Sequence, residues 1–252
     1  MADTTSRRSF LQSIGLGSAA LGLGSSALAQ QSEVPIPGFE QSPTDPDAAK
    51  KWKPVSDRKV RVGIVGYGRC RFGAAFSFQD HPNVDIVAVS DLFPDRCAAL
   101  AQACRCEKTY PSLEELVKDD RIEAVFVATD APSHARHCIE VLKHGKHAAC
   151  AVPAVWGSLD DADRLFEAVR RSGLKYMMFE TSVFREECYA MRRAYEAGAF
   201  GRIVYSEGEY YHFFGDEEIG SYKGWRNGLP PMYYPTHSMA YYTAVTGERF
   251  TK

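Results

Sequence analysis

Along the middle of the chain, short apolar runs alternate with longer segments in which apolar residues recur every three to four positions. Short apolar runs between turn residues are typical of buried parallel strands, and the longer spacing indicates amphipathic helices. The predicted strands are 60–65, 84–90, 124–128, 147–152 and 176–180. The predicted helices are 74–79, 95–104, 112–116, 133–143 and 159–172. This alternation predicts an α/β protein with a doubly wound parallel sheet and right-handed crossovers.

The pattern changes after Glu180. A helix is predicted over 186–197, and the alternation over 203–212 predicts a strand of a new sheet, followed by an aromatic, loop-rich segment. We therefore expect the parallel sheet to occupy a domain over 59–180 and to be followed by a partial α+β substrate domain over 181–252.

The first residues are typical of an export signal. Ser6-Arg7-Arg8-Ser9-Phe10-Leu11 is a twin-arginine pattern, and Ala27-Leu28-Ala29 offers the small residues that a signal peptidase reads. The stretch between them is too short and too rich in Gly and Ser to span a bilayer, which needs ~20 predominantly apolar residues, so we expect no membrane anchor. These features predict a twin-arginine signal peptide over 1–29, a linker or arm over 30–58, and a periplasmic or secreted protein. The alternative is a cytoplasmic protein whose first residues are not a signal.

Charge and cysteine usage narrow the function classes. The formal net charge of the 252 residues is −2 and no basic run occurs, which argues against nucleic acid or an anionic membrane surface as a partner. The seven cysteines are an odd number in a long chain, which favours buried thiols over a disulfide framework. Cys104 and Cys106 lack the spacing of a zinc knuckle, so we expect no metal site.

A glycine-rich turn follows the first predicted strand. Gly66 and Gly68 allow backbone N–H groups to approach a pyrophosphate at the start of a helix, as in the Rossmann dinucleotide-binding fingerprint. Arg71 stands where the third glycine of that fingerprint is expected, and Gly73 follows two residues later. The residues expected to contact the cofactor in this turn are Gly66, Tyr67, Gly68, Arg69, Arg71 and Gly73.

Asp91 ends the second predicted strand. A carboxylate at this place accepts hydrogen bonds from the adenine-ribose hydroxyls and repels a 2′-phosphate, which favours NAD over NADP. A helix or turn cap is the alternative role for Asp91. Arg69 and Arg71 keep NADP open as the less favoured cofactor.

The turn after the third predicted strand offers a second cofactor contact. The segment Thr129-Asp130-Ala131-Pro132-Ser133-His134 is expected over the carboxyl edge of the sheet, where the nicotinamide half of the cofactor runs. We therefore expect Thr129, Asp130 and His134 to bind the cofactor. The same segment is equally compatible with a structural role, in which Ser133 caps the helix and the histidine lies at the surface.

In their order and spacing, these segments resemble the Gfo/Idh/MocA family, the relatives of glucose–fructose oxidoreductase and inositol dehydrogenase. The resemblance covers Lys59 to the end of the chain and is carried by 62–68, Asp91, 128–134, 145–147, 196–201 and Tyr234-Pro235-Thr236-His237. The last motif and Met177-Met178-Phe179-Glu180-Thr181 look like the NAD-dependent glycosidase branch. That branch oxidises a sugar transiently, eliminates the aglycone and re-reduces the sugar.

The chain also departs from the family pattern. The family's catalytic Glu-Lys-Pro reads Ala151-Val152-Pro153 here, so an apolar Val152 replaces the acid/base lysine. The family's His-x-x-Asp pair retains His237 but has Ala240, and the tyrosine of the glycosidase branch is Phe184. The segment after Glu180 is shorter than the family's substrate domain, which predicts a truncated gene product.

The resemblance makes His237 the leading candidate for proton transfer, with Tyr234 as its neighbour. An imidazole can accept a hydroxyl proton near neutral pH while hydride leaves the same carbon for a nicotinamide. The alternative is a structural histidine in an aromatic loop. Weaker candidates for the substrate site are Glu180, Arg185, His212, Trp225 and Arg226.

These observations predict an exported NAD(P)-dependent oxidoreductase that acts on a sugar or glycoside by hydride transfer. A redox-assisted glycosidase is one alternative, and a catalytically inactive NAD-binding or sugar-sensing relative is another, favoured by Val152 and Ala240. The expected partner is a small-molecule sugar or glycoside. The sequence leaves open the sugar, the direction of reaction and the oligomeric state, a homo-oligomer included.

Overall fold

The computed structural model describes residues 53–211 and 220–250. Within these residues, six parallel strands form one sheet in the order β3-β2-β1-β4-β5-β6. The strands are β1 (Val60–Val65), β2 (Val84–Ser90), β3 (Thr109–Tyr110), β4 (Ala124–Val127), β5 (His147–Cys150) and β6 (Tyr176–Met178). The order reverses between β1 and β4, which is the Rossmann arrangement and confirms the predicted doubly wound sheet. The predicted signal peptide and the arm as far as residue 52 lie outside the described residues.

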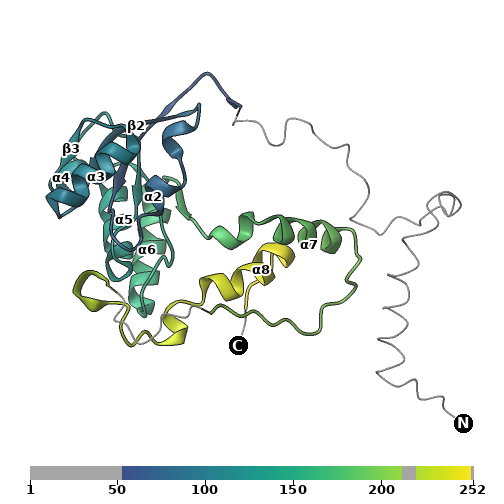
Figure 1. Cartoon of the computed structure of the whole chain (residues 1–252). Helices are drawn as coiled ribbons and strands as arrows, with labels where there is room; N and C mark the ends of the chain where they lie inside the picture. The colour runs from purple at the N-terminus through teal and green to yellow at the C-terminus, as the bar shows by residue number, and fades with distance from the viewer. Residues whose placement is uncertain (1–52, 212–219, 251–252) are drawn as a thin grey trace, which may run out of the picture.

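Helices cover both faces of the sheet (Figure 1). They are α2 (Phe72–Ala75), α3 (Pro94–Cys104), α4 (Leu113–Leu116), α5 (His134–Lys143) and α6 (Leu159–Ser172). Because successive strand residues point to opposite faces, Val125 and Val127 pack with α4, α5 and α6, whereas Phe126 packs with α2 and α3. Both faces are therefore apolar, which explains why the strands appear as continuous apolar runs.

The first helix is shorter than predicted. Instead of a helix over 74–79, α2 is a single turn and is followed by the 3-10 turn η1 (Phe78–Asp80). Between them Ser77 has a φ of 55°, in the left-handed region, which ends the helix. The other predicted helices of the sheet domain occur within a few residues of their expected bounds.

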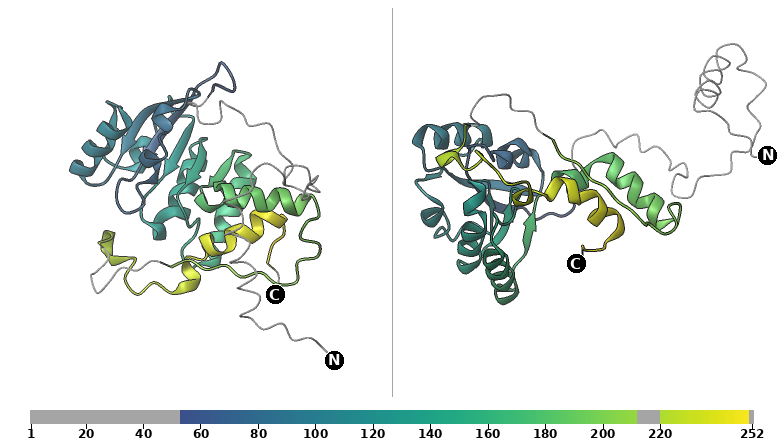
Figure 2. Two further views of the ribbon diagram at one scale, coloured as in Figure 1. Left: turned by 45° about the vertical axis from the view of Figure 1, so that its right-hand side comes forward. Right: turned by 90° about the horizontal axis from the view of Figure 1, so that it is seen from below.

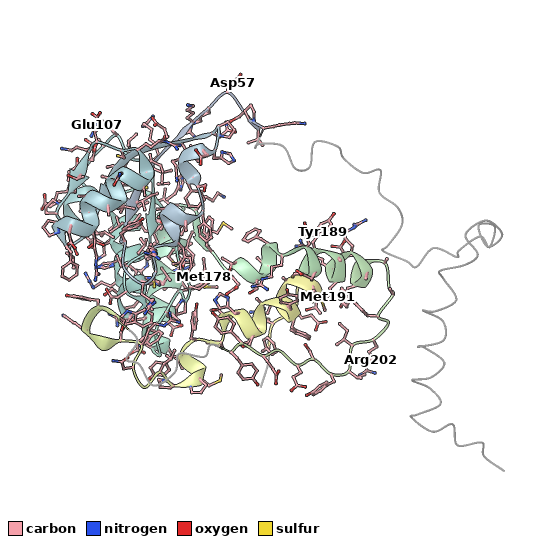
Figure 3. The ribbon with its side chains drawn as sticks, viewed as in Figure 1. Asp57, Glu107, Met178, Tyr189, Met191 and Arg202 are labelled. Atoms are coloured by element: carbon pink, nitrogen blue, oxygen red, sulfur yellow. The ribbon has the colours of Figure 1, made fainter. Side chains whose placement is uncertain are left out.

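Past the carboxyl end of β6, near Met178 in Figure 3, the chain forms η3 (Thr181–Phe184) and α7 (Glu186–Glu196). Helix α8 (Thr236–Thr246) packs beside α7, and all views show the two helices projecting together from one side of the sheet domain (Figures 1 and 2). The 3-10 turns η4 (Tyr222–Gly224) and η5 (Pro231–Tyr233) precede α8.

The strand predicted over 203–212 is wrong for its described part. Residues 203–211 make no strand pairing with any described residue, and Gly208 instead lies against the backbone of Ser238 in α8, a helix that makes its backbone hydrogen bonds within itself. His212 lies outside the described residues.

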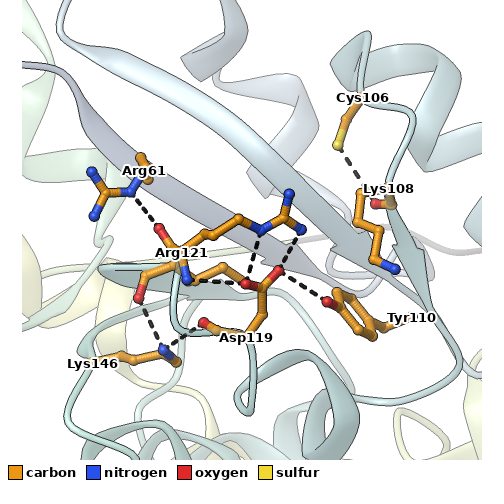
Figure 4. Close-up of polar contacts among 8 residues, drawn as sticks. Arg61, Cys106, Lys108, Tyr110, Asp119, Arg121 and Lys146 are labelled. Carbon is orange, nitrogen blue, oxygen red and sulfur yellow. Dashed lines mark hydrogen bonds and ion pairs between the residues drawn. The ribbon is translucent and has the colours of Figure 1, made fainter.

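A buried lysine fixes the loop that enters β4 (Figure 4). Lys146 is 5% exposed, and its Nζ donates to the carbonyl oxygens of Asp119 and Ile122 at 2.8 and 2.9 Å. The Asp119 carboxylate accepts hydrogen bonds from Arg121 and from the Tyr110 hydroxyl, and the Arg121 guanidinium holds the pKa of Asp119 well below its usual range. These bonds compensate for the burial of the ammonium group and hold the starts of β4 and β5 together.

The seven cysteines are buried thiols, in agreement with the prediction. Over the described ranges, we find no helix with the length and apolar character needed to cross a bilayer. In the same part of the chain, His, Cys, Asp and Glu side chains do not gather in groups of three or more that could hold a metal ion.

Candidate active site

The glycine-rich turn after β1 is held against the neighbouring strand. Gly66 has a φ of +100°, and a Cβ atom on it would lie 2.2 Å from the Ala128 carbonyl oxygen. No side chain fits there, because both the backbone conformation and the close approach require glycine. A Cβ atom on Gly73 would lie 2.8 Å from Ile64 Cγ2 and 2.9 Å from a ring carbon of Phe126. Gly73 thus provides the close helix–sheet packing of the third fingerprint glycine, from a position two residues later.

A cleft of ≈ 790 Å³ opens over this turn and over the carboxyl ends of β2 and β4. It is lined by all but one of the glycine-turn residues predicted to bind cofactor, Gly66, Tyr67, Gly68, Arg69 and Arg71, whereas Gly73 is buried beneath them. Since α2 is one turn long, its macrodipole is small. The positive charge at the cleft therefore comes mainly from side chains, namely the exposed Arg69 and Arg71 on the turn and Arg96, Arg136 and Lys223, which also line the cleft.

Asp91 lines the same cleft and organises its rim. Its Oδ2 accepts a hydrogen bond from the Tyr67 backbone N–H at 2.7 Å, and its Oδ1 accepts one from the Phe93 backbone N–H at 2.9 Å. Each carboxylate oxygen retains acceptor capacity for a ribose hydroxyl. Asp91 thus has the turn-capping role predicted as its alternative, while its carboxylate still lines the cleft.

The turn after β4 places two of its three predicted residues in the cleft. Thr129 and Asp130 line it, and Asp130 accepts a hydrogen bond from Ser133 Oγ at 2.9 Å. His134 does not line it. That ring is fully buried, with Nδ1 2.8 Å from the Pro153 carbonyl oxygen and Nε2 3.1 Å from the Thr129 carbonyl oxygen. The cofactor contact predicted for His134 does not fit this position, because its ring joins two loops beneath the cleft.

His137, which the sequence reasoning missed, lines the cleft instead. Its Nε2 accepts from Arg136 at 2.7 Å, so Nδ1 carries the proton and donates to Thr129 Oγ1 at 2.8 Å. Burial, and then the charge of Arg136, lowers the pKa of His137 to about 4. A neutral imidazole therefore orients Thr129 at neutral pH. The spacing of the two histidines could have identified His137 as a candidate, since it follows His134 by about one turn of α5.

A second cavity of ≈ 840 Å³ adjoins the cleft, between the sheet domain and the segment that contains α7 and α8. Arg69, Cys70, Phe72 and Trp225 line both cavities. Aromatic residues form much of its remaining wall, and Arg185 and Arg226, two of the weaker substrate-site candidates, also line it. Val152 lines the cavity too, so the position that replaces the family's lysine does face the expected substrate space.

Tyr234 and His237, the two predicted catalytic residues, lie together in this second cavity. The Tyr234 hydroxyl is 2.8 Å from His237 Nε2. On its other side, His237 Nδ1 is 2.5 Å from Oε1 of Glu180, and both side chains are at most 10% exposed. Ala240, where the family has an aspartate, is buried one turn farther along α8 and offers no proton-transfer group.

The surroundings shift the pKa values of this group. Burial raises the pKa of Glu180, but the hydrogen bonds from His237 and from the Ser182 backbone N–H outweigh burial, and the net shift is downward. Burial, with the neighbouring Tyr210, raises the pKa of Tyr234. Glu180 is therefore an ionised acceptor and Tyr234 a neutral hydroxyl at neutral pH.

Comparison with known proteins agrees with this geometry. Residues 60–180 match the GFO_IDH_MocA model, described as an oxidoreductase family with an NAD-binding Rossmann fold. A glycosyl hydrolase family 109 protein of Porphyromonas gingivalis is 29% identical over 194 residues, 71% of this chain and 41% of that protein. Myo-inositol 2-dehydrogenase of Thermotoga maritima is 26% identical over 143 residues, 57% of this chain and 42% of that protein.

A solved structure shows the same fold. The WlbA dehydrogenase from Bordetella pertussis, in complex with NADH and UDP-GlcNAcA, matches with a TM-score of 0.52 and 26% identity over 59% of this chain and 43% of that one. The matched part of the chain thus spans 41% to 43% of the length of these relatives.

Proposed function

Because residues 60–180 belong to the Gfo/Idh/MocA oxidoreductase family, we propose that this chain oxidises or reduces a sugar or glycoside by hydride transfer with NAD. The observation that carries the proposal is the adjoining pair of cavities. One has the glycine turn and carboxylate of a dinucleotide site, and the other contains Tyr234 and His237. Hydride transfer requires the nicotinamide and the sugar carbon to come into contact. The two cavities adjoin and share lining residues, so a nicotinamide in one could reach a sugar in the other.

The residues of the cleft fit a dinucleotide. The glycine turn exposes backbone N–H groups, Arg69 and Arg71 supply positive charge, and Asp91 offers carboxylate oxygens at the end of β2. When bound, the nicotinamide would accept or donate the hydride. The remaining chemistry belongs to the chain, which must bind the sugar and move the proton of its hydroxyl group.

Asp91 supports NAD over NADP. A 2′-phosphate on the adenine ribose would meet a carboxylate already held by the backbone of Tyr67 and Phe93. Arg69 and Arg71 lie on the turn that would hold the pyrophosphate, so they would pair with that group in this proposal.

Calorimetry and absorbance together test the proposed function. NAD⁺ and NADP⁺ are titrated separately into the purified chain, and the NAD⁺-loaded protein is then mixed with a panel of hexoses, uronates and p-nitrophenyl glycosides. We expect NAD⁺ to bind more tightly, and the reduced-nicotinamide band to appear with some panel members. Binding of neither nucleotide would refute the proposal.

Two alternatives have their own support. Val152 and Ala240 leave out two of the family's proton-transfer groups, which favours a catalytically inactive NAD-binding or sugar-sensing protein. Tight NAD binding without turnover, with activity appearing in Val152→Lys, would support it.

A redox-assisted glycosidase is favoured by the relative named as a glycosyl hydrolase family 109 protein, and aglycone release that depends on NAD⁺ would identify it.

Export through the twin-arginine pathway is part of the proposal. It is supported by the Ser6–Leu11 pattern and the small residues before Gln30. Sequencing the N-terminus of the protein from a periplasmic fraction tests it, and a first residue of Gln30 is expected. Recovery of the uncleaved protein from the cytoplasm alone would contradict it.

A further inference from the structure

Three side chains from two distant parts of the chain form one hydrogen-bonded series at the second cavity. Glu180 follows β6, whereas Tyr234 precedes α8 and His237 lies in its first turn. The series is Glu180 Oε1, His237 and the Tyr234 hydroxyl, with contacts of 2.5 and 2.8 Å on the two ring nitrogens. Tyr234 and His237 line the cavity, but Glu180 lies behind them.

The polarity of the series follows from the ionised carboxylate at its end. An ionised Glu180 only accepts hydrogen bonds, so His237 Nδ1 carries the proton that the bond requires. In a neutral imidazole the other nitrogen, Nε2, is then an acceptor, and the Tyr234 hydroxyl donates to it. Both ring nitrogens are thereby engaged, so the acceptor that this series presents to the cavity is the Tyr234 oxygen, which also hydrogen-bonds with the Tyr210 side chain.

Glu180 is itself held in place. Its Oε1 also accepts a hydrogen bond from the Ser182 backbone N–H at 2.9 Å, and only 6% of the residue is exposed. Its Oε2 is buried with no hydrogen-bond partner among the described residues. The Tyr210 ring packs on the His237 ring with centroids 4.4 Å apart, which restricts the imidazole from the cavity side. A buried carboxylate that is only partly satisfied by hydrogen bonds is costly, so Glu180 strongly favours the arrangement in which His237 Nδ1 carries a proton and donates it to Oε1.

We propose that Glu180 is a positioning residue that fixes the tautomer of His237, so that the Tyr234 oxygen, rather than His237, takes the proton from the substrate. This inference rests on the proposed function. As the substrate hydroxyl proton moves to the Tyr234 oxygen, the Tyr234 proton moves to His237 Nε2. The electron pair of the substrate C–H bond leaves with its hydrogen as hydride, to the oxidised nicotinamide. The imidazolium that results is paired with the Glu180 carboxylate.

The first test needs no substrate. The full chain, labelled with ¹⁵N-histidine, is examined by NMR, with the His237 signals identified by their loss in His237→Gln. We expect the wild-type ring to be protonated on Nδ1 and bare on Nε2. Glu180→Leu should lose this preference, whereas Glu187→Gln, an exposed glutamate on α7, should retain it. A wild-type ring protonated on Nε2 would overturn the proposal.

The second test separates positioning from binding. On the panel compound that the NAD⁺-loaded wild type turns over fastest, Glu180→Leu and Tyr234→Phe should each lower kcat by about 10²–10⁴-fold, the range of a positioned acid–base group. The Kd for NAD⁺ should stay within about 3-fold in both variants, and KM within about 3-fold in Glu180→Leu, because Glu180 does not line the cavity and would touch neither ligand. Glu180→Gln, which preserves the shape of the side chain and its Oε1 acceptor, should keep the tautomer and the fold but lose the charge, with an intermediate kcat.

The outcomes are distinguishable. Unchanged kcat in both Glu180 variants would overturn the positioning role, and unchanged kcat in Tyr234→Phe would overturn the role of its oxygen. If the wild type binds no nucleotide, the proposed function fails, while the NMR result still decides whether Glu180 fixes the His237 tautomer.

Discussion

Replacing Gly66 by alanine probes the contact on which the cleft at the glycine turn depends. The φ of +100° places an L residue in a disfavoured region, which costs of order 1–3 kcal/mol. The added Cβ atom would also lie 2.2 Å from the Ala128 carbonyl oxygen and 2.8 Å from the Thr129 backbone nitrogen. Both are backbone atoms at the end of β4, so they cannot turn away as a side chain could. Overpacking of this kind adds about 1–3 kcal/mol.

We therefore expect Gly66→Ala to lower the free energy of unfolding by about 2–6 kcal/mol, the sum of the two effects. The matched control is Gly173→Ala. Gly173 also has a positive φ, +67°, but a Cβ atom there would have no neighbour within 4 Å. Its cost should be the backbone strain alone, about 1–2 kcal/mol.

Urea denaturation of the wild type and both variants, followed by circular dichroism, measures the difference. The wild type and Gly173→Ala should also bind NAD⁺ alike, because Gly173 follows α6 and lies outside the cleft. If Gly66→Ala and Gly173→Ala were equally stable, the steric argument for the turn would be refuted, since strain alone would then account for both.

Three further substitutions test other parts of the cleft and sheet. Asp91→Ser should weaken NAD⁺ binding about 10–100-fold, the value of a charged hydrogen bond, while NADP⁺ binding stays or improves; equal losses for both nucleotides in calorimetry would contradict the ribose role. His137 is neutral in the fold down to about pH 4, whereas an unfolded histidine protonates near pH 6.5, so its lowered pKa costs stability as pH falls between these values. Between pH 7 and pH 4, the free energy of unfolding should therefore fall by up to about 3 kcal/mol less in His137→Gln than in the wild type. Urea midpoints that change equally with pH in the two proteins would contradict this. The lowered pKa of Asp119 contributes stability above about pH 4 that is lost on acidification. Asp119→Asn should therefore be less stable by about 1–3 kcal/mol at pH 7 and less sensitive to acid below pH 4, and equal stability of the two proteins at pH 7 would argue against it.

The elements that short-range chemistry controls could be predicted from the sequence. The β-branched residues of Val60–Val65 favour a strand, whose carboxyl half is buried, and the later apolar runs repeat this pattern. The turn at Gly66 and the carboxylate at Asp91 are also local features, because a positive φ and a strand end depend on residues close in sequence. The sequence therefore predicted the parallel sheet, apart from the two-residue β3, and the glycine turn and carboxylate that line the cleft.

Other assignments needed the tertiary structure. His134 and His137 are three residues apart on α5, about 60° apart around its axis, and the packing of that helix decides that His137 faces the cleft while His134 is buried. The alternation over 203–212 indicated a strand, but a strand exists only when a second segment pairs with it. Neither outcome is encoded in the spacing of the residues themselves.

By itself, then, the sequence determined where the sheet would form, which turn would line the cleft, and that Tyr234 and His237 would be neighbours. Only the tertiary structure brought Glu180 to His237 across 57 positions of sequence. The physical reason is that the properties of a titratable side chain depend on what desolvates it and which atoms accept its protons. Both are supplied by residues that chain folding, and not sequence proximity, places beside it.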